Sequence, residues 1–294
     1  MTNLARSTSP LADRDPAALL DDLRAGRAGA GPLPVLPPAV YARAHAAFES
    51  RSDQRRLIEQ HLAGRLALRG GGPVALLSVG CGDGTLDARL ATVLADAEPT
   101  RPVRYVGVDP YAGSTSGFAA ALGALDRPNL AVETHADTFA DATVGGTFDV
   151  VTFVHSMYYV ADVEEALLAA YALLRPGGEL LVLSGPRAEL NTLAALLAPP
   201  VDGRSQWFGD DVATALAGCT LPVADVTRLE ARLDLAGADD DVLDFTVQAR
   251  LTPGLREEVR AYLGAVGAES PGSGSADRFT VPHPVDVYRV TRPA

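Results

Sequence analysis

The chain has 294 residues, 47% of them hydrophobic, which is enough for one large or two small domains with a sizeable core. Its formal net charge of −12 argues against nucleic acid and anionic membrane surfaces as partners. The sequence contains two cysteines, too few for a disulfide framework, and no apolar run of membrane-spanning length, so we expect a cytoplasmic protein.

The first part of the chain reads as a flexible tail, residues 1–38. Pro16 to Arg27 can form one short helix with Asp15 as its N-cap. The glycines and prolines that follow interrupt regular structure. We expect this tail to be loose or to contact another copy of the chain.

Residues 39–70 carry a helical pattern of apolar side chains, interrupted at residues 50–53. The pattern predicts two helices, and two interpretations remain open for them. The helices either pack on a sheet or form a lid over a substrate pocket. In the second case Tyr41, Phe48 and Asp53 face the pocket.

The centre of the sequence is an apolar run, Val74–Val79, followed by glycines at positions 80, 82 and 84. The run predicts a short buried strand, and the glycines allow a sharp turn with no side chain between the backbone and a ligand. A helical pattern begins at Leu86, so the turn opens a helix whose free N–H groups attract anionic or polar ligands. The chain has no lysine, which excludes a Walker-type phosphate loop. The spacing G-x-G-x-G also differs from the dinucleotide fingerprint.

Two further strands are predicted after this helix. Residues 104–109 read as a strand that ends in Asp109, where a carboxylate can accept both ribose hydroxyls of an adenosyl ligand. A turn or helix-capping role for this aspartate remains the alternative. Residues 130–135 form the third predicted strand, and an acidic turn follows it.

A fourth strand is predicted at residues 148–155, and His155 and Tyr159 lie at its carboxyl end. Ligands of open α/β sheets bind at that edge, so these two side chains are candidates for function. A helix over residues 163–174 is closed by a proline and two glycines, and residues 179–184 are the fifth strand.

Beyond residue 185 the pattern is looser. We expect helices and strands in the following order: a helix at 188–197, a helix at 212–217, a strand at 226–235, a helix at 242–248, a helix at 255–266, a flexible loop at 270–275 and a final strand at 280–290. The alternation of strands and helices from 74 to 184 predicts an α/β, doubly wound parallel sheet.

Four motifs carry a resemblance to a known family. They are Val79–Gly84, Val106–Asp109, Phe148–Val151 and Leu174–Gly178, with the sequence Arg-Pro-Gly-Gly in the last. Together they resemble the core of class I S-adenosylmethionine-dependent methyltransferases. The resemblance implies a Rossmann-like, mostly parallel seven-stranded sheet with a helical lid at 39–70. It also implies a cofactor-binding core at 71–185 and, at 186–294, a smaller substrate-binding subdomain with the final strands.

The resemblance implies S-adenosyl-L-methionine as the cofactor, with S-adenosyl-L-homocysteine as the product, and no metal. It assigns the adenine amino group to the polar turn after the third strand, at Asp137, with a solvated turn aspartate as the alternative. The residues implied to bind the cofactor are Gly80, Cys81, Gly82, Gly84, Asp109, Asp137, Thr138, Val154 and His155.

A closer resemblance, over most of the chain, is to the histamine N-methyltransferase family. It is carried by Tyr41, Phe48 and the Ser-Asp-Gln sequence at 52–54, by residues 155–162, by 239–245 with 253–257, and by His283. The implied substrate contacts are Tyr41, Phe48, Asp53, Glu189 and His283, with Asp53 or Gln54 matching the acidic contact. The chain has His155 where the family has glutamine, Glu189 in the region of a tryptophan and His283 in place of asparagine. We therefore expect a shared scaffold and a different substrate.

The chemistry implied is in-line transfer of a methyl group to an amine or imidazole nitrogen of a small polar molecule. The protein must align donor and acceptor, which contributes about 7–11 kcal/mol. His155 is the candidate general base and Tyr159 a candidate wall of the methyl channel. His155 binding the cofactor or a backbone carbonyl, and Tyr159 packing in the core, are the alternatives. Cys81 reads as a packed side chain.

Two other functions remain open. The same cofactor can donate or cyclise its aminocarboxypropyl group, or the chain can be a non-catalytic adenosyl-binding partner protein. A nicotinamide dehydrogenase is disfavoured by the glycine spacing. We expect a monomer or homodimer with a small-molecule substrate.

Overall fold

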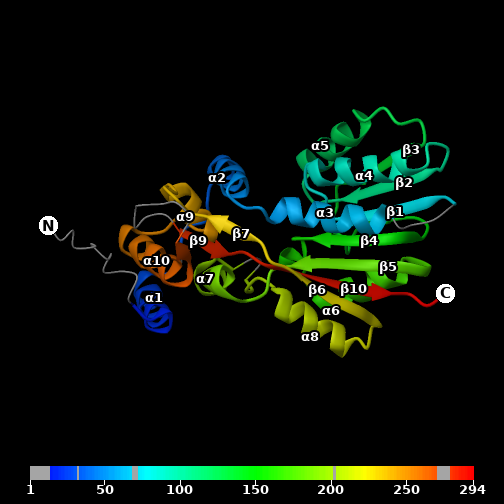
Figure 1. The fold of residues 1–294 in the computed structure, drawn as a ribbon. Helices are drawn as coiled ribbons and strands as arrows, with labels where there is room; N and C mark the ends of the chain where they lie inside the picture. Colours follow the sequence, from blue (N-terminus) through cyan, green and yellow to red (C-terminus); the bar gives the residue numbers. More distant parts are fainter. Residues whose placement is uncertain (1–13, 32, 68–71, 201–202, 270–278) are drawn as a thin grey trace, which may run out of the picture. The chain divides into compact units, whose positions relative to one another are not determined.

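The computed structural model describes residues 14–31, 33–67, 72–200, 203–269 and 279–294. The chain divides into two compact units, which are described separately (Figure 1). The first, called the helical unit, comprises the described parts of Met1–Arg55, Arg187–Gln206 and Glu230–Pro284. The second, called the sheet unit, comprises those of Arg56–Pro186, Trp207–Leu229 and Val285–Ala294.

The sheet unit is built on a seven-stranded sheet with the order β3-β2-β1-β4-β5-β10-β6. Strands β1 to β5 pair in parallel, and β10 is antiparallel to both β5 and β6. This confirms the predicted doubly wound, mostly parallel fold. The strands are β1 (Val74–Val79), β2 (Val103–Val108), β3 (Leu130–His135), β4 (Phe148–Val154), β5 (Leu174–Ser184), β6 (Val223–Leu229) and β10 (Val285–Thr291).

Helices cover both faces of this sheet, which explains why β1 is buried at every position and apolar at all of them except Ser78. Leu76 points into a core formed with α3, α4 and α5, whereas Leu77 points into a second core formed with α6 and α8. The helices of the unit are α3 (Gln54–Ala67, its first two residues in the helical unit), α4 (Thr85–Ala97), α5 (Ala112–Gly123), the 3₁₀ turn η1 (Met157–Tyr159), α6 (Val163–Ala172) and α8 (Gly209–Gly218).

The described residues of the helical unit form one apolar core and a small antiparallel sheet with the order β7-β9-β8. Its elements are α1 (Pro16–Ala30), α2 (Pro38–Ser50), α7 (Glu189–Leu197), α9 (Asp240–Thr246), α10 (Pro253–Val266), β7 (Arg232–Asp234), β8 (Ala268–Glu269) and β9 (Phe279–Pro282). The helices expected at 39–70, 188–197, 242–248 and 255–266 are present, with ends that differ by a few residues.

The helix predicted from Pro16 to Arg27 is present as α1, and it packs in the core instead of lying loose. Leu19 and Leu23, one helical turn apart, are fully buried in the core of the helical unit, and α1 packs along α10. The predicted cap is confirmed, since the Asp15 side chain accepts a hydrogen bond from the N–H of Ala17 at 3.1 Å. Two buried leucines stabilise this helix by about 1.5–3 kcal/mol each, which holds it in the fold.

Two predicted strands are each divided in the structure. The strand expected at 226–235 is β6 in the large sheet and β7 in the small one, because the chain passes from the sheet unit to the helical unit at Glu230. The strand expected at 280–290 is divided into β9 and β10 around Pro284, which has no N–H to donate to a ladder. The loop expected at 270–275 lies outside the described residues. Over the described ranges, none of the helices combines the length and hydropathy needed to cross a bilayer.

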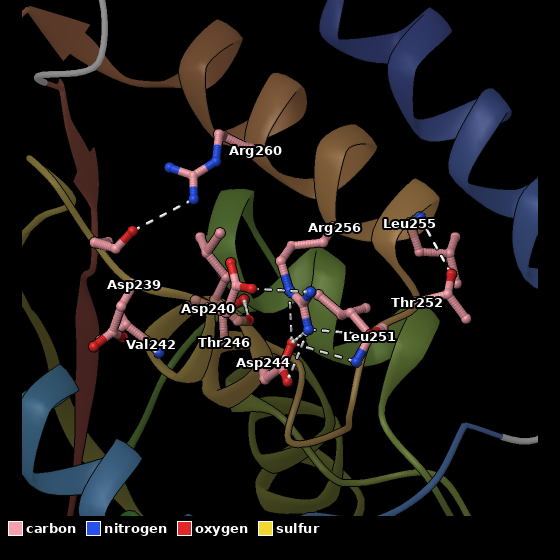
Figure 2. Close-up of polar contacts among 12 residues, drawn as sticks. Asp239, Asp240, Val242, Asp244, Thr246, Leu251, Thr252, Leu255, Arg256 and Arg260 are labelled. Atoms are coloured by element: carbon pink, nitrogen blue, oxygen red, sulfur yellow. Dashed lines mark hydrogen bonds and ion pairs between the residues drawn. The ribbon is translucent and has the colours of Figure 1, made fainter.

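A buried ion pair joins α9 to α10 in the helical unit (Figure 2). Asp244 is 1% exposed, and its Oδ1 accepts hydrogen bonds from Arg256 Nη2 at 2.9 Å and from the Leu251 N–H at 3.3 Å. Arg256 also donates to the Leu251 carbonyl oxygen at 3.1 Å and lies 3.2 Å from Asp240 Oδ2. Burial raises the pKa of Asp244, although Arg256 opposes the shift. The arginine is therefore the group that allows a carboxylate in this core.

Candidate functional site

The glycine turn after β1 has the geometry that the sequence predicts. Gly80 follows β1 with φ +70°, and its N–H donates to the carbonyl oxygen of Val108 at 2.7 Å. A Cβ atom at position 80 would overlap the Cβ of Ser156, whose hydroxyl donates to the Val79 carbonyl oxygen at 2.6 Å. The turn is thus closed from the side of β4, and only glycine fits at its first position.

The other two glycines of the turn differ in their surroundings. Gly84 has φ +77°, and a Cβ there would lie 2.7 Å from the Cα of Phe118 in α5. Gly82 has φ +56°, but a Cβ at that position would meet no described protein atom within 4 Å. The backbone of the turn is therefore packed at Gly80 and Gly84 and open at Gly82. A ligand that approaches the bare backbone has access at Gly82.

Asp109, the acid at the end of β2, holds the turn in place. Its carboxylate is buried and accepts from the N–H of Gly82 at 3.1 Å and from the N–H of Tyr111 at 3.0 Å. The Asp109 N–H donates to the carbonyl oxygen of His135 at 3.1 Å, so the ends of β2 and β3 lie side by side. The carboxylate has a turn-holding role of its own, and the predicted contact with ribose stays a prediction.

Cys81 lies inside the turn and is buried. Burial, reinforced by the nearby carboxylates of Asp87 and Asp109, raises the pKa of its thiol, so the sulfur stays protonated near neutral pH. Below the turn the hydroxyl of Tyr105 donates to Asp87 Oδ1 at 2.8 Å. The structure therefore favours the interpretation of Cys81 as a packed side chain and gives no basis for a nucleophile.

The residues expected after β3 lie on the surface. Asp137 and Thr138 are exposed, two and three residues beyond the end of the strand at His135. The Thr138 hydroxyl donates to Asp141 Oδ2 at 2.6 Å and accepts from the Asp141 N–H at 3.3 Å. Thr138 therefore stabilises the turn that it begins, as serine and threonine commonly do.

At the end of β4, Val154 is half-buried and His155 adopts φ +52°, a left-handed conformation that is uncommon for residues other than glycine. The N–H of His155 donates to the Leu183 carbonyl oxygen at 3.0 Å, and its Nδ1 lies 3.1 Å from the hydroxyl of Tyr158. Tyr159, the other catalytic candidate, is 46% exposed, and its ring meets the Tyr158 ring edge-on. This exposure disfavours core packing for Tyr159.

All the residues expected to bind the cofactor follow or end β1, β2, β3 or β4. These four strands are parallel neighbours, so the residues share one edge of the sheet. No role was predicted from the sequence for Ser156 or Tyr158. In the structure Ser156 packs against Gly80, and the Tyr158 hydroxyl contacts His155. Their position at the same strand end was the available signal.

In the helical unit, two of the five expected substrate contacts pack on the ring of Phe245, and a third, His283, packs on one of these two. Phe48 lies 5.0 Å from Phe245 between ring centroids, and Tyr41 lies 5.3 Å from it. The ring of His283 meets the ring of Phe48 edge-on at 5.2 Å. Phe245 itself was not expected, because the acidic stretch around it gave no sign of an aromatic cluster.

His283 is held by polar contacts on two sides. Its Nδ1 lies 2.8 Å from the hydroxyl of Ser52, and its carbonyl oxygen accepts from the Gln54 side chain at 2.7 Å. Burial lowers the pKa of His283 to about 4, against the opposing effect of Asp53, so its ring is neutral at pH 7. His283 is therefore available as a neutral imidazole and not as a cation.

The two acidic substrate candidates have backbone roles in the structure. Asp53 Oδ1 accepts from the Arg232 N–H at 2.8 Å, and the Asp53 N–H donates to the Arg232 carbonyl oxygen at 3.2 Å. Glu189 begins α7 with φ +35°, and its carbonyl oxygen accepts from the Tyr262 hydroxyl at 3.3 Å. Asp53 thus attaches the start of α3 to the first residue of β7 through two hydrogen bonds. A substrate contact for Asp53 or Glu189 stays a prediction.

The lowered pKa of His283 predicts a pH-dependent stability. The unfolded chain binds a proton at this residue with a pKa near 6.5, whereas the folded chain does so only near 4. Stability is therefore constant above pH ~7 and falls as pH drops toward 4, by about 2 kcal/mol at pH 5. We expect His283→Asn to remove that part of the slope in urea unfolding measured from pH 5 to 8. An unchanged slope in the variant would mean that other groups cause it.

A family model described as a methyltransferase domain matches residues 50–209, more than half of the chain. The chain belongs to this methyltransferase-domain family. The match covers the glycine turn, the acid of β2 and the exit of β4. It supports the function that the resemblance implies for the sheet unit, and the order of the seven strands agrees with it.

One curated relative that is similar to part of this chain is also a methyltransferase. The ubiquinone biosynthesis O-methyltransferase of Nitrobacter winogradskyi is 32% identical over 103 residues, which are 35% of this chain and 35% of that protein. The match thus spans about a third of the length of this curated relative.

Two solved structures share the fold. One is a provisionally assigned methyltransferase from Bacillus halodurans C-125, with 13% identity and a TM-score of 0.55 over 80% of this chain and 99% of that chain. The other is the YcgJ protein of Bacillus subtilis, with 12% identity and the same TM-score and coverage. Identities this low establish the fold alone.

Proposed function

We propose that this protein transfers a methyl group from S-adenosyl-L-methionine to a small polar molecule by in-line displacement. The observation that carries the proposal is the glycine turn, which is packed at Gly80 and Gly84 but leaves the backbone open at Gly82. The carboxylate of Asp109 lies against the same turn. A nucleoside cofactor needs such a bare backbone with a carboxylate beside it.

The residues present fit this cofactor. The turn from Gly80 to Gly84 is proposed to bind its amino-acid part, Asp109 its ribose, and Asp137 with Thr138 its adenine. Val154 and His155 are proposed to lie near its sulfur. When bound, the cofactor supplies the electrophilic methyl group. The protein contributes orientation and exclusion of water, which are large terms in such a transfer.

The methyl acceptor is proposed to be a nitrogen of an amine or imidazole, with Tyr41, Phe48, Asp53, Glu189 and His283 as its proposed contacts. The aromatic cluster of Tyr41, Phe48 and Phe245, with His283 beside it, supports an aromatic or apolar body for this substrate. The resemblance to the histamine N-methyltransferase family supports nitrogen. An oxygen acceptor is the second candidate, because the curated relative from Nitrobacter is an O-methyltransferase.

The proposal predicts that Gly82→Ala weakens S-adenosylhomocysteine binding at least tenfold, about 1.4 kcal/mol, in isothermal titration. The new Cβ meets no described protein atom, so the expected loss of stability is only the backbone strain of φ +56°, about 1–2 kcal/mol. The added methyl group would occupy the space proposed for the ligand.

Gly177→Ala is the matched control, because Gly177 has φ +75° with nothing within 4 Å but lies in the first part of β5, away from the carboxyl edge. It should lose similar stability and keep its affinity. If the unmodified protein binds no S-adenosylhomocysteine, the proposed function is wrong. If it binds and both variants bind equally well, the glycine turn is not the site.

The reaction type is tested by mass spectrometry of the products formed from the cofactor. We expect S-adenosylhomocysteine. Methylthioadenosine would instead indicate transfer or cyclisation of the aminocarboxypropyl group. Binding with no product on any acceptor tried would favour a non-catalytic adenosyl-binding protein.

A further inference from the structure

His155 in the sheet unit and His283 in the helical unit each have the same local arrangement. In each, the Nδ1 atom lies within hydrogen-bonding distance of a hydroxyl group, and that hydroxyl also accepts a backbone N–H. For His155 the hydroxyl is that of Tyr158, and for His283 it is that of Ser52.

The Tyr158 oxygen accepts the N–H of Gly185 at 2.8 Å, so its own proton must point elsewhere. Two side chains lie beside it, those of His155 and Ser184. The contact with hydrogen-bond geometry is to His155 Nδ1, at 3.1 Å, whereas the Ser184 hydroxyl makes none among the described residues. Burial raises the pKa of Tyr158 to about 12, so the hydroxyl keeps that proton at neutral pH. Donation to Nδ1 leaves the single proton of a neutral imidazole on Nε2.

Ser52 repeats this arrangement on a shorter side chain. Its oxygen accepts the N–H of Gln54 at 3.2 Å, and His283 Nδ1 lies 2.8 Å away. Donation of the hydroxyl proton to Nδ1 would place the proton of the His283 ring on Nε2. The Gln54 side chain fixes the backbone of His283 as well, through its carbonyl oxygen.

We propose that Tyr158 and Ser52 are positioning residues that fix His155 and His283 as Nε2–H tautomers, so that each histidine presents a hydrogen-bond donor to a ligand. A neutral imidazole in this form has no lone pair at Nε2. His155 then binds an acceptor atom and does not act there as a general base. The chemical class recognised is a carbonyl, carboxylate, hydroxyl or unprotonated nitrogen, and an ammonium group is excluded from direct contact with either Nε2.

The tautomers are measured without any ligand, by long-range ¹H–¹⁵N correlation on protein labelled with ¹⁵N-histidine at pH 7. His155→Gln and His283→Gln assign the signals, and His45, His61 and His135 serve as references. We expect the Nε2–H pattern for both site histidines. An Nδ1–H pattern in either would overturn the assignment for that residue.

The two hydroxyl deletions control each other. Tyr158→Phe should convert His155 to a mixture of tautomers and leave His283 unchanged, whereas Ser52→Ala should do the reverse. Ser52→Thr, which keeps the hydroxyl, should restore the His283 pattern. A merely structural role would leave the tautomers unchanged in the deletion variants, provided that circular dichroism shows both to be folded. If Tyr158→Phe does not fold, the Ser52 pair still decides the proposal.

The ligand class rests on the proposed function and is tested separately, with benzamide and benzoate against benzylamine. The benzene ring matches the aromatic cluster around His283, and the three probes differ in their polar group. We expect benzamide or benzoate to shift the His283 Nε2 signal and benzylammonium to leave it unchanged. A shift with benzylammonium alone, or with none of the three, would overturn the ligand class. Titration with S-adenosylhomocysteine decides the proposed function independently of these outcomes.

Discussion

Gly80→Ala is expected to destabilise the protein by about 4 kcal/mol, the sum of left-handed strain and overpacking in a filled site. Its φ of +70° is unfavourable for alanine, and the new Cβ would overlap the Cβ of Ser156. The first carbon of a side chain can move only with its backbone, and Ser156 is tied to the Val79 carbonyl oxygen. The free energy of unfolding in urea is the measurement.

The overlap can be separated from the strain by a second substitution. Ser156→Gly removes the atom that the new Cβ would meet, so Gly80→Ala with Ser156→Gly should cost clearly less than the sum of the single changes. Gly177→Ala, at φ +75° with open space around it, gives the strain alone. If Gly80→Ala costs no more than Gly177→Ala, the turn is not packed as the structure has it.

Arg256→Met should be comparably severe, about 3–5 kcal/mol, because it leaves a buried carboxylate without its partner. Asp244 is 1% exposed and loses the hydrogen bonds from the guanidinium, keeping the N–H of Leu251. Local opening should follow in the helical unit. Hydrogen–deuterium exchange of the α9 and α10 amides is the measurement, and we expect faster exchange in both helices.

The pH dependence of this effect has a definite sign. Burial already raises the pKa of Asp244, and loss of Arg256 raises it further. A carboxyl with a raised folded pKa is tolerated while it is protonated and destabilises the fold as pH rises through that pKa. The cost of Arg256→Met should therefore be smaller at pH 5 than at pH 8. Adding Asp244→Asn should recover part of the loss, and equal costs at both pH values would contradict the ion-pair interpretation.

The sheet unit could be predicted because its signals are local. An apolar run such as Val74–Val79 is typical of a strand covered on both faces, and the glycine spacing marks the turn after it. The family resemblance then implied a mostly parallel sheet of seven strands, whereas the order of the strands and the antiparallel place of β10 come from the structure. Residues at the carboxyl ends of parallel strands share an edge, so the placement of Asp109 and His155 could be predicted as well.

The helical unit could be predicted less well, because its structure depends on contacts between distant segments. The strand pattern of apolar residues at 280–290 is continuous along the sequence. In the structure it is divided at Pro284, where the chain leaves β9 of the small sheet and enters β10 of the large one. Leu19 and Leu23 have helical spacing, which favours the predicted helix. Two leucines in a segment rich in glycine and proline were too weak a signal to predict that this helix is buried in the core. The hydrogen bonds of Ser52 with His283 and of Tyr158 with His155 depend on side-chain rotamers, which no sequence pattern specifies.

The late position of β10 has a consequence for biosynthesis. This strand lies between β5 and β6, yet the ribosome produces it after all its sheet neighbours. Until it emerges, the nascent chain exposes the unpaired edge of β5, and β6 has no strand to pair with. Unpaired edges recruit other chains. Chaperone dependence during translation should therefore end only with the appearance of Val285–Thr291, whatever the state of the glycine turn by then.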